Sequence, residues 1–375
     1  MSQVLLHRAR RVRRLRIGVA LVLAAVGLAL ALACGERRHS EGPMTPLSAL
    51  FAPTHTVRLR SSTSASMGLQ YVVQATPDEL LAIESGTQDL WSLPLTDDRT
   101  ARRLGTLRRR GRARVVGMAA RVGRFGMLDL AGMLRLYHAG SVNASDRWSL
   151  TVPKGTRAVA LLATADSSWL IVEQRSSGDP AARTMRDSVI VVSASPQGRM
   201  RTEWAFERAE PARSGSLMTD FVAATSFGDT VVLTAADPAR ITTWVRNTAG
   251  TLRQDILTGV RASPMSALDR EALRVVAAPV YDPLTRAAQL PSHYPPIAGA
   301  RPDGLGWFVV AGRGATSFAL DYYCRNAFEQ TLLDHPAVRT VTLLDSAVAV
   351  TREDLPGGGV AVEYYPYGVF ARRCR

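Results

Sequence analysis

The stretch RVVGMAARVGRFGMLDLAGMLRLYHAG, residues 114–140, decides the fold of this 375-residue chain. It contains three short apolar segments, RVVGMAA, GRFGMLD and MLRLYHA, and a glycine lies at or beside each junction between them. Apolar runs of this length that are bounded by turn residues and lack a helical period are typical of β-strands. We interpret the stretch as three consecutive strands joined by short turns.

The same arrangement recurs six times along the chain. In each copy a turn residue opens an apolar strand, and these strands start at Asp78, Gly123, Asp166, Gly228, Gly304 and Asp345. A second strand follows each one, starting at Asp89, Met133, Asp187, Ile241, Thr316 and Gly359. Most copies also have an earlier strand, such as LQYVVQA or RAVALLA. The copies are spaced by about 40 to 45 residues where no insertion intervenes, which is the period of a four-stranded propeller blade.

These repeats predict an all-β, six-bladed β-propeller. A single four-stranded sheet cannot bury both of its faces, whereas blades packed face to face around an axis can. A solenoid of stacked hairpins is the competing interpretation, but its open ends would need capping segments. None is evident in the sequence.

The two ends of the chain are expected to close the ring together. The last repeat stops soon after its third strand, near Tyr365 and Tyr367, while HTVRLRS, residues 55–61, is an unassigned strand ahead of the first repeat. We therefore predict that residues 55–61 complete the sixth blade beside residues 360–365. Such pairing covers a sheet edge that would otherwise be exposed.

The chain resembles the six-bladed, NHL-like β-propeller lipoproteins of the bacterial envelope. The resemblance extends over about residues 55 to 370 and is clearest in residues 114–140, ADPARITTWVRNTAGTLRQDI (residues 236–256) and PSHYPPIAGARPDGLGWFVVAG (residues 291–312). It implies a fold and a location in the envelope. It carries little information on activity, because propellers host many functions.

An export signal precedes the repeats. Residues 17–33, IGVALVLAAVGLALALA, are uncharged and follow a start that contains six arginines, an order typical of a secretory signal. The sequence Ala31-Leu32-Ala33-Cys34-Gly35 resembles the lipobox of bacterial lipoproteins, which implies lipidation of Cys34. The alternative is an uncut signal anchor. We predict a signal peptide over residues 1–33, a flexible tether over 34–53 and the propeller over 54–375.

Two cysteines remain once Cys34 is lipidated. In an oxidising compartment an even remainder favours pairing, so we predict a disulfide between Cys324 and Cys374. Two independent thiols are the alternative. The spacing of the three cysteines does not suggest a structural zinc site.

The basic composition does not by itself indicate nucleic-acid binding. Without residues 1–33 the net charge falls from +14 to +8, because that segment holds six arginines and no acid. The densest arginine run, residues 99–114, contains no aromatic residue that could stack on bases. We interpret it as a solvated outer strand and turn; contact with anionic lipid or with polymer phosphates is the alternative.

The search for a catalytic or metal-binding constellation is negative. Calcium prefers six or more oxygen ligands, but the predicted inner strands YVVQATPDE, VVGMAAR, AVALLATA and FVAATS are almost free of acid. The histidines are scattered, and Ser214-Gly215-Ser216 does not form a nucleophile elbow. We therefore predict no catalytic, cofactor-binding or metal-binding residues. Neighbouring residues of a strand point to opposite faces, so one ring of each pair Tyr322-Tyr323 and Tyr364-Tyr365 could face the core and the other solvent. We expect core packing for these pairs, with a ligand platform as the alternative.

Two insertions interrupt the repeats. The interval from residue 257 to residue 300 contains SPMSALDREALRVVAA, in which Ser263 can cap a helix and Pro264 can begin it. This helix is expected either to lie across one mouth of the ring or to fill a blade junction. The segment RSSGDPAARTMR, residues 175–186, is expected to form a long hairpin loop.

Three classes of function agree with the sequence. The first is a monomeric, non-enzymatic binding or scaffold propeller, attached to the membrane through the lipid on Cys34, that holds a peptide, glycan or envelope partner at one mouth of the ring. Its expected location is the outer membrane, facing the periplasm or the surface. The second is an exported propeller enzyme, a hydrolase or a sugar-oxidising protein. The third is a structural component of an envelope assembly machine.

Overall fold

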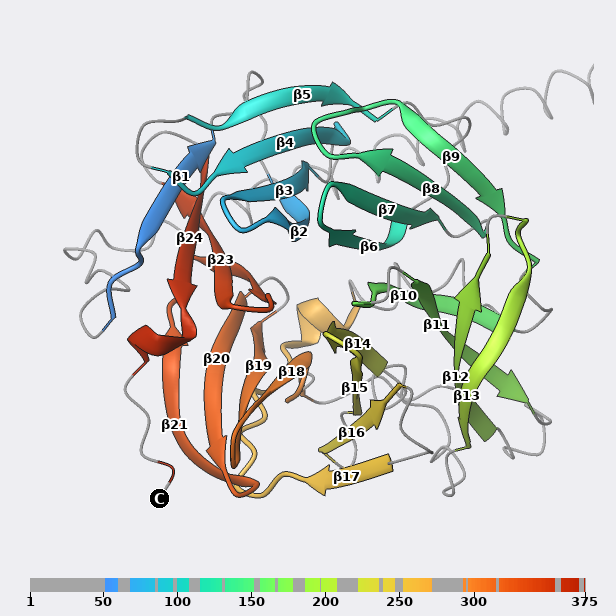
Figure 1. The fold of residues 1–375 in the computed structure, drawn as a ribbon. Coiled ribbons are helices and arrows are strands. Elements are labelled where there is room, and N and C mark those ends of the chain that lie inside the picture. Colours follow the sequence, from blue (N-terminus) through green and yellow to red (C-terminus); the bar gives the residue numbers. More distant parts are fainter. Residues whose placement is uncertain are drawn as a thin grey trace, which may run out of the picture. The chain divides into compact units, whose positions relative to one another are not determined.

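In the described part of the chain, the strands form six four-stranded antiparallel sheets that surround an axis as the blades of a β-propeller (Figure 1). The computed structural model describes residues 51–59, 68–84, 87–96, 100–107, 115–129, 132–151, 156–165, 168–177, 186–195, 197–207, 222–235, 239–246, 252–271, 293–294, 296–314, 317–354, 359–370 and 374. All of them belong to one unit, residues 50–375. The predicted fold class and number of blades are confirmed.

The strands of each blade follow one another from the innermost to the outermost. Blade one contains β2 (Leu69–Thr76), β3 (Glu79–Glu84), β4 (Asp89–Pro94) and β5 (Arg102–Thr106). Blade two contains β6 (Val115–Arg121), β7 (Arg124–Asp129), β8 (Met133–His138) and β9 (Ala144–Ser149). Blade three contains β10 (Thr156–Ala163), β11 (Trp169–Ser177), β12 (Arg186–Ala194) and β13 (Met200–Glu207).

The second half of the ring repeats this order. Blade four contains β14 (Val222–Phe227), β15 (Thr230–Ala235), β16 (Arg240–Val245) and β17 (Leu252–Ile256). Blade five contains β18 (Gly299–Asp303), β19 (Gly306–Gly314), β20 (Ser317–Cys324) and β21 (Ala327–Asp334). Blade six contains β22 (Val338–Leu343), β23 (Ala347–Asp354), β24 (Gly359–Pro366) and, from the other end of the chain, β1 (His55–Leu59).

The strand that follows the inner strand in each blade is apolar because both of its faces are buried. In β3, Leu80 and Leu81 are both fully buried although their side chains point to opposite faces of the sheet. Leu80 packs in a cluster with Ala347 and Ala349 of blade six, whereas Leu81 packs with Phe125 of blade two. The hydrophobic core is thus divided into layers between neighbouring blades, and a strand with two buried faces reads as a continuous apolar run.

The closure of the ring agrees with the prediction. Strand β1 pairs antiparallel with β24, and the register runs from His55 opposite Tyr364 to Leu59 opposite Val360. Val57 and Leu59 are buried in the layer between blades six and one. Residues 60 and 61, the last two of the predicted closing strand, lie outside the described residues. The inner strands β2, β6, β10, β14, β18 and β22 also contact one another in ring order, and β22 contacts β2.

Small residues allow the closest approach between blades two and three. A Cβ atom on Gly126 would lie 2.8 Å from the ring of Trp169, and one on Gly117 would lie 2.5 Å from the backbone nitrogen of Leu161. Any larger side chain at these two positions would push the blades apart. The glycines of β6 and β7 are therefore required by packing rather than by a turn.

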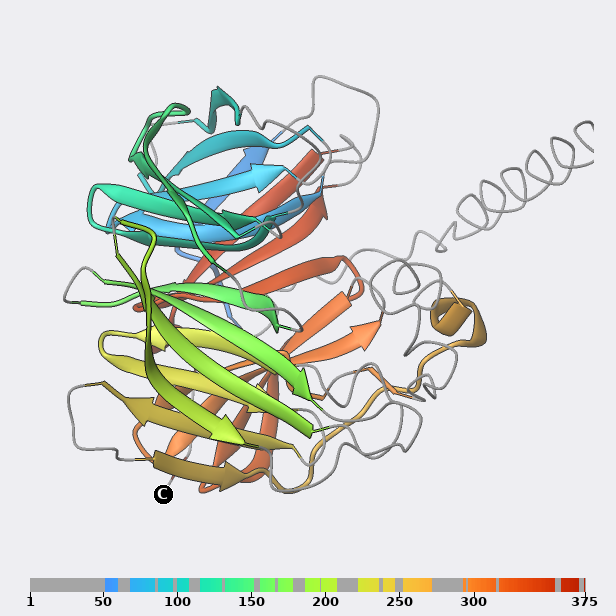
Figure 2. The same ribbon diagram turned by 90° about the vertical axis from the view of Figure 1, so that its right-hand side faces the viewer.

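The long insertion before blade five lies partly over one end of the ring. Residues 267–271 are helical. In Figure 1 this gold helix projects near the axis, and in Figure 2 it lies beyond the strands on the side opposite the C-terminus. Of the two expected positions, the views agree with the one across a mouth of the ring. The rest of the predicted helix, residues 272–278, lies outside the described residues.

The predicted start of this helix is wrong. The N–H of Asp269 donates to Ser266 Oγ at 3.1 Å, so Ser266 occupies the capping position expected for Ser263. Pro264 instead forms an isolated bridge with His293, and the N–H of Tyr294 donates to the Ser263 carbonyl at 2.9 Å. Residues 293 and 294 therefore pair with residues 263 and 264, and the helix begins about one turn later, at residue 267.

Two other expectations fall on the blades. The segment of residues 175–186 belongs to the hairpin of β11 and β12, as predicted, and its residues 178–185 lie outside the described part. The tyrosine pairs pack in the core as expected, because Tyr322, Tyr323, Tyr364 and Tyr365 are all buried. Both faces of their strands are covered, so neither pair presents a ring to solvent.

Candidate functional site

A cavity of about 960 Å³ lies between the inner strands of the ring. It is lined by residues of β2, β6, β10 and β14 and by the end of β22 with the turn after it. The lining reaches the mouth where these strands end, at Pro77, Val122, Ala165, Gly228 and Ser346. We call this end the turn mouth, because each inner strand turns there into the second strand of its blade.

Hydrogen bonds between neighbouring inner strands hold the wall of the cavity. Ser226 Oγ donates to the carbonyl of Ala163 at 3.0 Å, which joins β14 to β10 near the turn mouth. Thr225 Oγ1 donates to the carbonyl of Ala300 at 3.1 Å, which joins β14 to β18. Both hydroxyl groups are thus used to join neighbouring inner strands.

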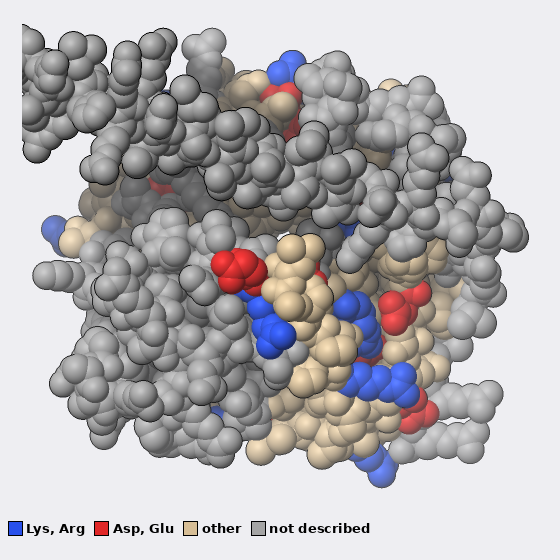
Figure 3. Space-filling model, turned by 180° about the vertical axis from the view of Figure 1, so that it is seen from behind, with Lys and Arg blue, Asp and Glu red and all other residues tan. Residues whose placement is uncertain are grey.

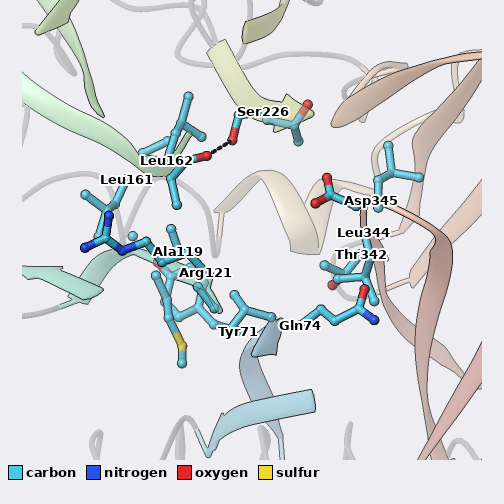
Figure 4. Close-up of a pocket in the computed structure, with 18 of the residues that line it drawn as sticks. Tyr71, Gln74, Ala119, Arg121, Leu161, Leu162, Ser226, Thr342, Leu344 and Asp345 are labelled. Atoms are coloured by element: carbon cyan, nitrogen blue, oxygen red, sulfur yellow. Dashed lines mark hydrogen bonds between the residues drawn. The ribbon is translucent and has the colours of Figure 1, made fainter. Parts of the chain in front are cut away.

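Figure 4 shows that the two sides of the cavity differ. Ala119, Leu161 and Leu162 form an apolar side that belongs to β6 and β10. Gln74 of β2 and Thr342 of β22 lie on the opposite side with Asp345, which follows β22. The cavity is therefore amphipathic, and its polar side is built where the first and last blades meet.

Asp345 is the one acidic residue among the described residues that line the cavity. Its carboxylate points toward the middle of the cavity in Figure 4 and remains accessible to solvent. The surrounding protein removes part of its water and raises the pKa of the carboxyl above its ordinary value, and the positive charge of Arg301 opposes this shift. No hydrogen bond joins the carboxylate to the residues that the structure describes.

The nearby arginines are engaged elsewhere. Arg301 donates to the backbone carbonyls of Asp345 at 2.7 Å and of Pro302 at 3.2 Å. Its guanidinium lies 3.9 Å from the ring centre of Tyr367 and 5.3 Å from that of Phe227. These contacts fix Arg301 between two aromatic rings, so it supports the turn that carries Asp345 rather than neutralising the carboxylate directly.

Arg121 is the other charged residue in the lining. Its guanidinium lies 5.0 Å from the ring centre of Trp169 and points away from the middle of the cavity (Figure 4). Cation–π contacts of this kind hold a guanidinium against an aromatic face. The cavity thus presents a single carboxylate to a ligand, while both neighbouring cations are held by the wall.

Within the blades, away from the axial cavity, arginines form ion pairs with carboxylates. Among the described residues, every blade has at least one arginine whose nitrogen lies 2.6 to 2.8 Å from a carboxylate oxygen. Blades one to five contain Arg103–Asp89, Arg135–Asp129, Arg201–Glu203, Arg253–Asp255 and Arg313–Asp321, and blade six contains Arg352–Glu363 and Arg339–Glu353. Arg102 and Arg103 lie exposed on β5, the outermost strand of blade one, as the sequence predicted for the first part of residues 99–114. Residues 108–114 lie outside the described part. On the described part of the face in Figure 3, basic and acidic side chains lie side by side.

The structure brings the two predicted bridge cysteines together. Cys324 at the end of β20 and Cys374 are joined by a disulfide, with their Cα atoms 5.2 Å apart. Formation of this bond in the cell stays a prediction. Cys34 lies outside the described residues, and so do Ser214, Gly215 and Ser216.

Sequence reasoning missed Asp345 as a cavity residue. The acid search covered the inner strands, whereas Asp345 belongs to the turn that follows one of them. The signal was present in the repeat itself, because a turn residue precedes the apolar strand of every copy, and in the sixth copy this turn residue is Asp345. Within the part of the chain that the structure describes, no group of three or more His, Cys, Asp or Glu residues is arranged to hold a metal ion. No helix there is long and apolar enough to cross a membrane.

Comparisons with known proteins support the fold and no more. No protein-family model matches the chain, and no curated protein matches it. Among solved structures, a "Putative exported protein" from Bacteroides fragilis NCTC 9343 is similar with a TM-score of 0.50 and 8% identity, over 83% of this chain and 94% of that one. The Cps50 (Swd1) β-propeller domain of Myceliophteria thermophila is similar with a TM-score of 0.42 and 12% identity, over 79% and 82%.

Proposed function

We propose that this protein is an exported, lipid-anchored propeller of the bacterial cell envelope that binds a ligand in its axial cavity without chemical conversion. The cavity carries the proposal. It is large enough for a side chain or a small molecule, and it opens at the turn mouth. Its wall combines an apolar side with a few polar groups, which is the usual composition of a binding site.

The rim of the turn mouth supports this function. Val122 and Leu305 lie in the turns of blades two and five and are 87% and 61% exposed. Two apolar side chains at opposite sides of a six-membered ring offer contacts to a partner larger than the cavity itself. The peptide, glycan or envelope protein to which the mouth is presented would lie across these turns.

The chemistry of the lining favours binding over turnover. A hydrolase that uses general acid and base groups needs a second titratable side chain beside the first. Among the described lining residues Asp345 has no such neighbour, and the cation nearest to it, Arg301, is held between aromatic rings. An exported enzyme is the alternative, and steady conversion of a captured ligand by the purified protein would establish it.

A blocking substitution tests the binding function. Ala165 is exposed at the turn mouth and lines the cavity, whereas Ala205 is exposed on the outer strand β13. Protein purified from its native host is analysed by native mass spectrometry for a retained ligand. We expect Ala165→Trp to lose the ligand and Ala205→Trp to keep it. Equal retention by both variants would contradict binding in the cavity.

The anchor is tested separately. Cys34→Ser should remove the fatty acid and leave the protein as a precursor or in the inner membrane. Metabolic labelling with a fatty-acid analogue measures this, and Cys324→Ser serves as the control that keeps its label. Label retained by the Cys34 variant would contradict lipidation at this residue.

A further inference from the structure

The ligand of the cavity can be narrowed by its charge. The middle of the cavity faces one carboxylate, Asp345, and no hydrogen bond from a described residue reaches it. A carboxylate accepts hydrogen bonds only, and its strongest partners are ammonium and guanidinium groups. An anionic ligand would be repelled at this point, and a neutral one would leave the charge without a counterion.

Among the described residues, neither of the two arginines beside the cavity donates a hydrogen bond to the carboxylate of Asp345. Arg301 donates its hydrogen bonds to the backbone carbonyl oxygens of Pro302 and Asp345, and its flat face is covered by Tyr367. Arg121 lies on the opposite side and stacks on Trp169. Both guanidinium groups are held by contacts with the cavity wall, so we expect a ligand to supply the group that binds the carboxylate of Asp345.

The polar neighbours of Asp345 can accept hydrogen bonds from a cationic ligand group. Thr342 and Gln74 lie on the same side of the cavity in Figure 4, on the two inner strands that meet where the ring closes. The hydroxyl of Thr342 makes no hydrogen bond to the described residues, and Gln74 makes a long one, 3.4 Å, from Nε2 to the carbonyl of Pro77. Both offer acceptor oxygens to the remaining protons of an ammonium or guanidinium group.

The opposite side fits an apolar body. Ala119, Leu161 and Leu162 carry no polar side-chain atom, and they face the polar side across the cavity (Figure 4). Each methylene group of a ligand that is buried against such a wall leaves water and strengthens binding. The two sides together select a molecule with a cationic end and an apolar portion.

We propose, on the basis of the binding function above, that the cavity takes an organic cation: a protonated amine or a guanidinium carried on an apolar chain, paired with the carboxylate of Asp345. A free alkylamine and a Lys or Arg side chain of a peptide share this chemistry. The exposed Val122 and Leu305 at the rim favour the peptide as the source.

Isothermal titration calorimetry with three probes of equal length tests the charge: hexylammonium, hexanol and hexanoate. We expect hexylammonium to bind at least about tenfold more tightly than either of the others, since a hydrogen bond to a charged group is worth about 1.5 kcal/mol or more. Two blocked peptides, Leu-Lys-Leu and Leu-norleucine-Leu, test the source. Tighter binding of the lysine peptide than of hexylammonium indicates a peptide, and the reverse indicates a free amine.

Matched variants locate the site. Asp345→Asn should weaken hexylammonium binding about tenfold, and Asp345→Glu should keep most of it. Asp78→Asn removes an exposed acid from the neighbouring turn that does not line the cavity, and it should change nothing. Equal binding of the three probes, no binding of any, or an unchanged affinity in Asp345→Asn would each overturn the proposal. Loss of the native ligand in Ala165→Trp would still support the cavity as a binding site in those cases.

Discussion

Charged residues have different surroundings within the blades and at the axis of the ring. Within the blades, carboxylates such as Asp321 and Glu363 are buried and paired at short distances with Arg313 and Arg352. At the axis, Asp345 faces a cavity without such a partner among the described residues. The buried carboxylates need their arginines, because a buried charge without a partner costs stability. Asp345 is accessible to solvent, so its carboxylate needs no such partner for folding and is open to a ligand.

Ring closure should produce the largest effect among the structural contacts. A chain that begins at residue 62 lacks β1, and with it the burial of Val57 and Leu59. We expect it to lose about 3 to 6 kcal/mol, since full burial of each such side chain contributes about 1.5 to 3 kcal/mol. A chain that begins at residue 51 keeps β1 and should unfold as the full protein does. Urea unfolding measures both, and equal midpoints would contradict closure by β1.

Loss of a buried ion pair within a blade should have the next largest effect on stability. Arg313→Met leaves Asp321 buried without its guanidinium partner, and we expect a loss of about 3 to 5 kcal/mol at pH 7. Burial already raises the pKa of Asp321, and Arg313 opposes that rise. In the variant the pKa should rise further, and the carboxyl can then take up a proton as the pH falls. The loss should therefore be smaller at pH 5 than at pH 7. Arg201→Met, whose arginine is 78% exposed, is the control with little effect.

The disulfide should contribute less. Cys374→Ser opens a bridge that closes a loop with a sequence separation of 50, and we expect a loss of about 2 to 4 kcal/mol. The fold should persist, because the aromatic contacts of Phe370 with Phe51 and Phe308 still hold the end of the chain. Circular dichroism with thermal melting checks both points. Free thiols at both positions in periplasmic protein, seen by mass spectrometry of unreduced peptides, would refute the bridge.

The pair Arg103–Asp89 of blade one, whose arginine is half exposed, should matter least. Arg103 on the outer strand β5 is the main reason why the pKa of Asp89 lies below its ordinary value. The pair therefore contributes above the ordinary carboxyl range, and the contribution is lost as the pH falls. Solvent screens an arginine that is 52% exposed, so Arg103→Met should leave the urea midpoint at pH 7 almost unchanged. A large loss would show that exposed pairs also hold the blades together.

The fold was predictable because its signals are local and repeated. The six turn residues mark the same position in each blade, and HTVRLRS was the one strand left to complete the ring. The tyrosine pairs pack in the core as predicted, although strand alternation alone would leave one ring of each pair in solvent, because neighbouring blades bury both faces of each strand. The helix start was misjudged because the preference for proline at the first turn ignored the pairing of Pro264 with His293. The cavity depends on how five blades converge, which no local pattern encodes.

The free energy of unfolding of Asp345→Asn tests the central claim most directly. The raised pKa of Asp345 means that its charged form is disfavoured in the folded protein, so above that pKa the carboxylate lowers stability. At pH 7 we predict that urea unfolding gives the variant a free energy equal to or slightly above that of the original protein, as expected for a residue kept for binding. A loss of about 2 kcal/mol or more, comparable with the loss of a buried ion pair within a blade, would contradict the claim and make Asp345 a structural residue.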